Sequence, residues 1–287
     1  MKIGHCVVVA LNPPGQYADD GNLRARQRFW LHQSPYFDIE GWVLDLAGLA
    51  PGMKVLDAGC GNGLYLRAMA GRQVRAAGCD LSMGMLRSVA CPALFSADVA
   101  ALPVCDGVFD VVLAVHMLYH VPDRAAAVRE MRRVLMPGSV CVAVTNGARH
   151  TRSLRALVER AVGKGMPGWR MTPATQAFTA ENAAAQLGAA FGSVTCVRPP
   201  SQPPVVIRDA AVAADYVASM ASHYQDDHPE LLTDPRILQP RGRLPCPGRP
   251  GGAARGSWCR ARPTGRAVPP RAAARRSRAA PTGWTAP

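Results

Sequence analysis

The chain lacks the sequence features that mark several classes of protein. Its nine cysteines include no C-x-x-C pair, so the spacing indicates neither a zinc or other metal site nor a disulfide framework. No hydrophobic run approaches the roughly 20 residues that span a bilayer, and the apolar residues 6–11 are too few for a signal-peptide core. We therefore expect a soluble protein with reduced thiols, no membrane partner and a cytoplasmic location.

Acidic side chains are absent from residues 236–287, which hold twelve arginines. The formal net charge of the chain is +13, and subtracting these twelve leaves about +1 for residues 1–235. The segment is rich in Ala, Arg, Pro and Gly without hydrophobic periodicity, which predicts a disordered tail. Three interpretations stay open: an RNA- or membrane-binding arm, an appendage without function, or the product of a shifted reading frame, which we favour.

A cofactor site is indicated by residues 55–63, Val-Leu-Asp-Ala-Gly-Cys-Gly-Asn-Gly. They describe a buried strand that breaks into a glycine turn and opens a helix, so that a ligand can lie against bare backbone. Leu64 stands where the dinucleotide fingerprint needs its third glycine, which disfavours NAD. Asp57 would repel a pyrophosphate and attract an amine. A phosphate-free nucleoside with an ammonium group, such as S-adenosylmethionine, fits both observations.

Acids also follow the next two predicted strands. Asp80 ends the strand at 74–80, where a βαβ unit places the carboxylate that binds ribose hydroxyls. Ser82 can cap the following helix, and Met85 on its first turn offers a polarisable face for adenine. Asp98 ends a third strand and can accept the adenine amino group.

These motifs resemble the class I S-adenosylmethionine-dependent methyltransferases, in their ubiquinone- and menaquinone-methyltransferase-like branch. The resemblance covers much of residues 15–225 and rests on VLDAGCGNG at 55–63, GCDLSMGML at 78–86, ADVAALP at 97–103, FDVVLAVHMLYHVPD at 109–123 and RRVLMPGSV at 132–140. It implies a methyltransferase that binds S-adenosylmethionine. It assigns Asp57, Gly59, Cys60 and Gly61 to the methionine end, Asp80 and Leu81 to the ribose, Met85, Asp98 and Val99 to the adenine, and Val115 and His116 to the wall beside the sulfonium.

The predicted fold is α/β, with a doubly wound, mostly parallel, Rossmann-like sheet. Beyond the strands already named, we expect strands at 109–115, 140–145 and 193–198. Helices are expected at 18–33, 36–49, 123–135, 151–162, 180–190 and 209–222. We divide the chain into a helical cap at 1–50, a cofactor-binding domain at 51–235 and the tail. The family closes its sheet with a last antiparallel strand, and we expect that strand to be missing here.

Candidate catalytic residues follow the fourth strand. Methyl transfer needs a base only if the acceptor must lose a proton. His116 is the best placed candidate, with a hydrogen-bonded wall residue as the alternative, and His120 is a second candidate that can instead hold the loop before Asp123. Tyr119 is a further candidate.

Three other residues can border the site. In related enzymes a tyrosine placed like Tyr17 folds over the cofactor, although a surface turn is the alternative. Asn146 and His150 follow the fifth strand on the side of the acceptor.

The acceptor itself is predicted to be a small molecule, and a specialised metabolite by analogy. The nearly neutral body argues against nucleic acid as a partner. Two alternatives are an RNA (tRNA) methyltransferase that uses the basic tail, and a cofactor-binding module without activity. The sequence does not indicate the oligomeric state.

Overall fold

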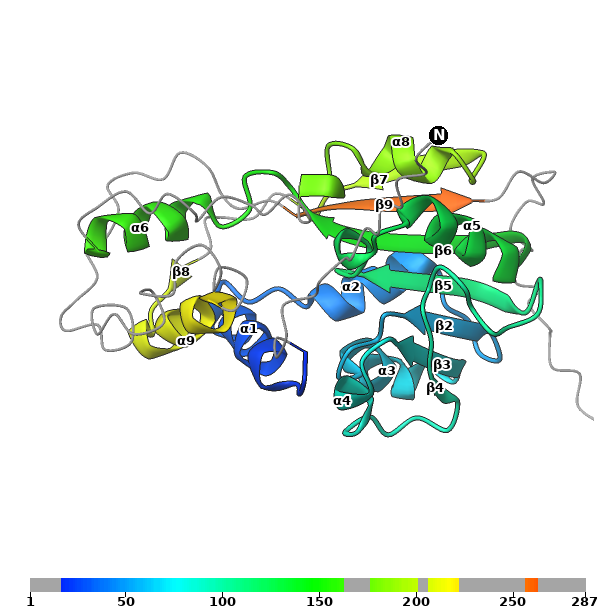
Figure 1. Ribbon diagram of the computed structural model, residues 1–287, viewed down its shortest axis with the longest axis horizontal. Coiled ribbons are helices and arrows are strands. Elements are labelled where there is room, and N and C mark those ends of the chain that lie inside the picture. Colours follow the sequence, from blue (N-terminus) through cyan, green and yellow to red (C-terminus); the bar gives the residue numbers. More distant parts are fainter. Residues whose placement is uncertain (1–16, 163–175, 201–205, 222–255, 263–287) are drawn as a thin grey trace, which may run out of the picture.

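A seven-stranded sheet forms the centre of the molecule (Figure 1). The computed structural model describes residues 17–162, 176–200, 206–221 and 256–262. The strand order is β4-β3-β2-β5-β6-β9-β7. The five parallel strands are β2 (Lys54–Ala58), β3 (Arg75–Asp80), β4 (Leu94–Ser96), β5 (Phe109–Val115) and β6 (Leu135–Asn146). This order, with the first long strand in the middle, confirms the predicted doubly wound α/β fold.

Helices cover both faces of the sheet, because successive side chains of a strand point to opposite sides. In β5, Val111 and Leu113 pack with α2 (Ile39–Ala47) and α3 (Leu64–Met69). The alternate residues Val112 and Ala114 belong to the core that α5 and α8 complete. A nearly continuous apolar strand is what burial on both faces requires. The helices of the second face are α5 (Arg124–Val134) and α8 (Ala183–Gly188).

Aspartates fix the starts of two of these helices. The Asp38 carboxylate accepts a hydrogen bond from the Gly41 amide at the start of α2. Asp123 caps α5 by accepting from the Ala126 amide at 2.8 Å, as its place before the helix predicts. Each cap satisfies an amide that has no partner within the helix itself.

The sheet contains the closing strand that the sequence analysis expected to be missing. β9 (Gly256–Arg262) lies between β6 and β7 (Ser193–Val197) and runs antiparallel to both. Two expectations are therefore wrong: the antiparallel strand is present, and the tail is not disordered throughout. A ladder is built from backbone groups, so the open edges of β6 and β7 can pair with a segment of weak strand propensity. Residues 236–255 and 263–287 lie outside the described part.

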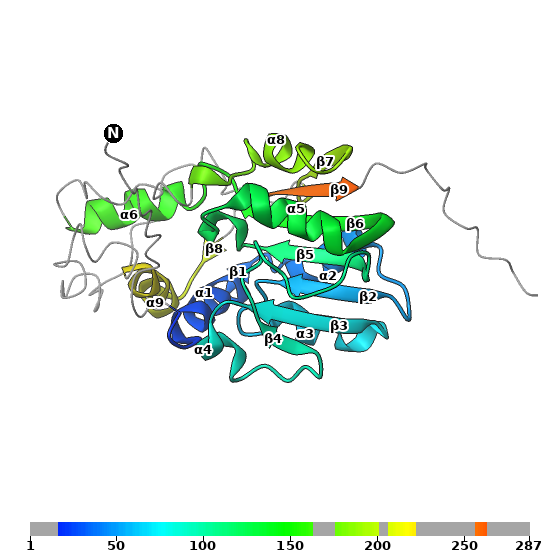
Figure 2. The same cartoon turned by 45° about the vertical axis from the view of Figure 1, so that its right-hand side comes forward.

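A second group of elements stands beyond the carboxyl ends of the parallel strands, toward which the arrows of β5 and β6 point (Figures 1 and 2). α1 (Gly21–Leu31) and α9 (Ala210–Ala221) lie side by side, and the rings of Phe29 and Tyr216 are 4.3 Å apart. β1 (Gln33–Ser34) and β8 (Val206–Ile207) form a small antiparallel pair. α6 (Arg152–Val162) follows β6.

The remaining elements are short. They are the 3-10 turns η1 (Ala70–Arg72) and η2 (Leu118–His120) and the helix α4 (Met83–Leu86). Within the described ranges, no helix has the length and hydropathy needed to cross a membrane. The boundaries of the three proposed domains stay a prediction, and α2 packs against the sheet rather than with α1.

Candidate cofactor and acceptor site

The glycine turn after β2 is held against β3 by its backbone. The amides of Gly59 and Cys60 both donate to the Cys79 carbonyl, at 2.8 and 2.9 Å. Gly59 and Gly61 have φ angles of +72° and +52°, a region that favours glycine. A Cβ atom on Gly59 would lie 2.8 Å from the Cβ of Met117. The turn therefore needs glycine for its backbone conformation and for its close approach to the neighbouring loop.

The buried side chain of Asp57 indicates a binding position for a ligand. It is 1% exposed, and its Oδ2 atom has no hydrogen-bond partner among the residues that the structure describes. Burial, with a contribution from the nearby charge of Asp80, raises the pKa of Asp57 to about 7. Buried polar atoms in folded proteins are nearly always paired. An ammonium group beside Asp57 would supply the missing partner and the missing charge.

Asp80 lies at the same edge of the sheet and organises the turn. Its Oδ2 accepts from the Gly61 amide and its Oδ1 from the Ser82 amide, both at 2.8 Å. Burial raises the pKa of Asp80, while these two hydrogen bonds and the Leu81 amide oppose the shift. Each carboxylate oxygen has a second lone pair, which leaves acceptor capacity for ribose hydroxyls. The predicted neighbour Leu81 is 65% exposed.

The three residues expected at the adenine differ in their exposure. Met85 is 2% and Val99 5% exposed, so both lie inside the core beneath the site. Asp98 is exposed and uses Oδ1 to accept from the Ala100 amide. Cys60, assigned to the methionine end, is 7% exposed, and burial raises its thiol pKa, so the thiol stays neutral.

Helix α1 closes against the glycine turn, which sequence reasoning missed. The side-chain amides of Gln27 and Asn62 exchange two hydrogen bonds of 3.0 Å, and Asn62 is 3% exposed. A Cβ atom on Gly61 would meet the Leu23 side chain at 3.0 Å. The sequence predicted a helix at 18–33, but a predicted helix does not say what its polar side chains contact.

Tyr17 joins the two sides of the site. Its hydroxyl is 2.9 Å from His120 Nε2, and its backbone carbonyl accepts from the Ser82 hydroxyl at 2.7 Å. Since Ser82 follows β3 and His120 follows β5, Tyr17 spans the end of β2 that lies between them. The structure thus brings Tyr17 and the candidate base His120 together, and the covering role of Tyr17 stays a prediction.

His116 follows β5, next to Val115, in an unusual backbone conformation. Its φ is +52°, and its amide donates to the Val144 carbonyl at 2.9 Å. Positive φ in a non-glycine residue costs free energy and often marks a functional site. Burial lowers the pKa of His116 and of His120 to about 4. Both rings are therefore neutral at pH 7 and are weak bases.

Aromatic and imidazole side chains gather near His150, where the acceptor is expected. His150 lies 5.6 Å from Trp30 between ring centroids, and its Nδ1 atom is buried without a hydrogen-bond partner among the described residues. Burial first, then the charges of His116 and Arg155, lower the pKa of His150 to about 3. Burial raises the pKa of the Tyr119 hydroxyl, so Tyr119 stays protonated. The backbone carbonyl of Asn146 accepts a hydrogen bond from the Ala180 amide.

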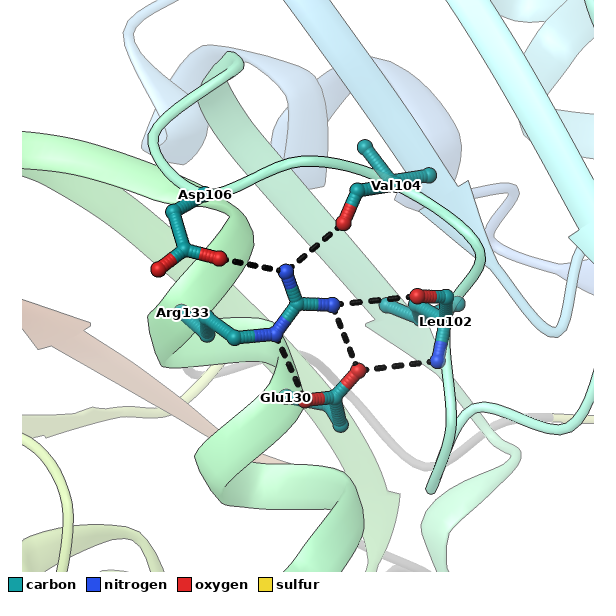
Figure 3. Close-up of polar contacts among 5 residues, drawn as sticks. All are labelled: Leu102, Val104, Asp106, Glu130 and Arg133. Carbon is teal, nitrogen blue, oxygen red and sulfur yellow. Dashed lines mark hydrogen bonds and ion pairs between the residues drawn. The ribbon is translucent and has the colours of Figure 1, made fainter.

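An ion-pair network fixes residues 102–106, in the loop that follows Asp98 (Figure 3). Arg133 on α5 donates to the Glu130 and Asp106 carboxylates and to the carbonyls of Leu102 and Val104. Glu130 also accepts from the Leu102 amide at 2.8 Å. The hydrogen bonds to Glu130 and Asp106 raise the pKa of Arg133. This network supports residues 102–106 and is not part of the site itself.

Part of the chain is similar to known methyltransferases. Residues 56–143 match the family model of a methyltransferase domain. A ubiquinone biosynthesis O-methyltransferase of Pseudomonas aeruginosa is 36% identical over 127 residues, which are 39% of this chain and 54% of that protein. The chain thus spans about half the length of the curated relatives it matches.

Solved structures share the fold at low sequence identity. The cyclase SpnF aligns with a TM-score of 0.53 and 19% identity over 79% of this chain and 80% of its own. A Haloferax volcanii protein solved in complex with the Trm112 methyltransferase activator aligns with a TM-score of 0.51 and 18% identity, over 88% of this chain and 99% of its own. Because one of these folds is described as a cyclase, the fold alone does not set the reaction.

Proposed function

We propose that the chain carries a class I S-adenosylmethionine-dependent methyltransferase core, and that the whole protein uses it to transfer a methyl group to a nucleophilic atom of a small molecule. The observation that carries this proposal is the buried Asp57 carboxyl beside a turn of bare glycine backbone, whose Oδ2 atom has no hydrogen-bond partner among the described residues. Asp80 adds a second carboxylate at the neighbouring strand end. The two acids suit a cationic nucleoside and oppose a pyrophosphate.

The residues present fit S-adenosylmethionine. Asp57 would hold its ammonium group, the turn at Gly59–Gly61 its methionine chain and Asp80 its ribose. The cofactor supplies an activated methyl carbon, so the protein has to align the acceptor and exclude water. Tyr17 and α1 can serve this purpose, because Tyr17 bonds His120 and α1 bonds Asn62 of the glycine turn.

A small acceptor is favoured over RNA by the charges and by the elements around the site. The twelve arginines lie in the tail, and residues 1–235 carry almost no net charge. The helices α1 and α9 pack together through aromatic rings, whereas a nucleic acid would need a basic track. The matched relative from Pseudomonas aeruginosa acts in ubiquinone biosynthesis by its name, which supports a ring-shaped metabolite as the class of acceptor.

A methyl-release assay tests the proposal and separates its alternatives. The protein is incubated with isotope-labelled S-adenosylmethionine and either pooled bacterial metabolites or bulk tRNA, and the label is located by mass spectrometry. Label in a small molecule supports the proposal. Label in tRNA supports the RNA methyltransferase. Binding of the cofactor with no transfer to either pool supports the inactive module.

A further inference from the structure

Arg26 introduces a positive charge on the acceptor side that the methyl-transfer chemistry does not itself require. The residue lies on α1, and its Nη2 atom donates to the Ser219 carbonyl on α9 at 2.6 Å. Its charge acts on Tyr17, Tyr119 and His120, which come from the N-terminal segment and from the turn after β5. The guanidinium therefore stands among polar side chains that α1, α9 and η2 bring together.

The negatively charged side chains of the site follow strands of the sheet, whereas the positively charged Arg26 lies on α1. The carboxylates Asp57 and Asp80 lie at the ends of β2 and β3, where the cationic cofactor is expected. Arg26 instead acts on Tyr17 and on Tyr119 and His120 of η2, which burial keeps neutral. A cation in such surroundings acts on its neighbours with little screening by water. This distribution suits a positively charged donor at one end and a negatively charged acceptor at the other.

His150 and Trp30 extend this surface by one helical turn. Trp30 is four residues after Arg26, so both side chains lie on the same face of α1. The Trp30 ring is tilted 34° from the His150 ring at 5.6 Å, and it is also within 6.4 Å of the Tyr216 ring. The Nδ1 atom of His150 is buried in this group and has no hydrogen-bond partner in the part of the chain that the structure describes. Planar rings with one unsatisfied polar atom suit a planar, oxygen-bearing ligand.

We propose that Arg26 is an acceptor-binding residue that pairs with an oxyanion on a planar ring, while His150 Nδ1 bonds a second polar atom of the same molecule. The inference rests on the proposed methyl transfer and adds the charge of its acceptor. The oxyanion can be a carboxylate or an ionised ring hydroxyl, since a guanidinium binds both.

An acceptor hydroxyl that is already ionised also needs no general base, because it has lost its proton before methyl transfer. His116 and His120 are weak bases, so neither is suited to take a proton from a neutral hydroxyl during the reaction. An opposite charge within about 6 Å lowers the pKa of an acid by roughly 1–3 units, so Arg26 favours loss of this proton to water before transfer. The oxyanion then uses a lone pair to form the bond to the methyl carbon. The carbon–sulfur bond breaks with its electron pair, which leaves a neutral thioether and no proton to remove.

The test compares charged and neutral probes of the same shape. Benzoate and 4-nitrophenolate are titrated calorimetrically into the full-length protein, beside their neutral counterparts benzamide and 4-nitroaniline, with and without S-adenosylhomocysteine. We expect each anion to bind at least tenfold more tightly than its counterpart. The Arg26→Gln variant should lose this preference, and Arg26→Lys should keep part of it. Preference for benzoate alone assigns the carboxylate, and preference for 4-nitrophenolate alone assigns the ring hydroxyl.

Arg28→Gln is the matched control, since Arg28 lies on the same helix and pairs with the exposed Asp215. It should retain the preference for anions. Equal affinity for charged and neutral probes in the wild type would overturn the inference, and so would a preference that Arg28→Gln abolishes as fully as Arg26→Gln. If S-adenosylhomocysteine binds but anions are not preferred, this inference is wrong and the proposed function is not affected. Its failure to bind removes the proposed function as well.

Discussion

The raised pKa of Asp57 makes the stability of the cofactor-free protein depend on pH. A carboxyl with a pKa of about 7 in the folded state and an ordinary value in the unfolded state binds more protons when folded. Its contribution to stability is therefore present at low pH and is lost as pH rises from about 4 to about 7. The cofactor reverses this preference, because an ammonium group favours the charged carboxylate.

The Asp57→Asn variant should remove that pH dependence. Without cofactor, we expect the variant to be more stable than the wild type at pH 8 by a few kcal/mol, since three pKa units correspond to about 4 kcal/mol. Urea unfolding at pH 5 and pH 8 measures this, with the exposed Asp45→Asn as a control. An equal loss of stability between the two pH values in wild type and Asp57→Asn would contradict the assignment.

His116 is predicted to act as a wall residue rather than as the base. Its low pKa makes proton transfer to it unfavourable, and its amide already bonds Val144. The His116→Asn variant suits the test because asparagine tolerates positive φ better than most residues. We expect turnover on the true acceptor to fall by less than about tenfold. A loss of about 10² or more with unchanged cofactor affinity would restore His116 as the general base.

At the scale of elements, the glycine turn connects β2 to α3 and to the loop after β5. Gly59 needs positive φ and has Met117 close by, whereas Gly107 has φ of +63° and open space around it. A substitution at Gly107 therefore tests backbone strain alone, whereas a substitution at Gly59 tests backbone strain together with steric overlap.

We expect Gly107→Ala to cost about 1 kcal/mol of stability, from strain alone. Gly59→Ala should cost more and should also weaken S-adenosylhomocysteine binding by at least tenfold, because Met117 and the turn must shift. Thermal melts and calorimetric titrations of the two variants measure both effects. Equal stability and undiminished binding in Gly59→Ala would show that the turn has room that the structure does not predict.

The core strands and the acids at their ends could be predicted from the sequence, because their signals are local. Asp57 and Asp80 each end an apolar run, and parallel strands bring such ends to one edge. Arg26 and Gln27 could not be identified in this way, since polar residues on an amphipathic helix usually face water. β9 was missed because its pairing with β6 spans more than a hundred residues and leaves no local period.

At the scale of the whole molecule, β9 joins the two parts of the sheet. It pairs with β6 from Cys141 to Asn146 and with β7 from Ser193 to Val197. Without it, both strands would present open edges, which favour aggregation. The tail therefore contributes to the fold, contrary to the expectation from its composition.

Truncation after Thr233 should lower the melting temperature by several degrees or more and promote aggregation. Cys259→Pro in the full chain should act in the same direction, because proline cannot donate to a ladder paired on both sides. Differential scanning calorimetry with light scattering measures both variants, and Cys259→Ser serves as the control. An unchanged melting temperature after truncation would mean that β9 does not hold the sheet together.

The most direct test of the central claim is a calorimetric titration of the full-length wild type with S-adenosylhomocysteine and, separately, with NAD. We expect saturable binding of S-adenosylhomocysteine at one site per chain, weakened at least tenfold in Asp57→Asn, and no binding of NAD. Absence of S-adenosylhomocysteine binding, or saturable binding of NAD at this site, would contradict it.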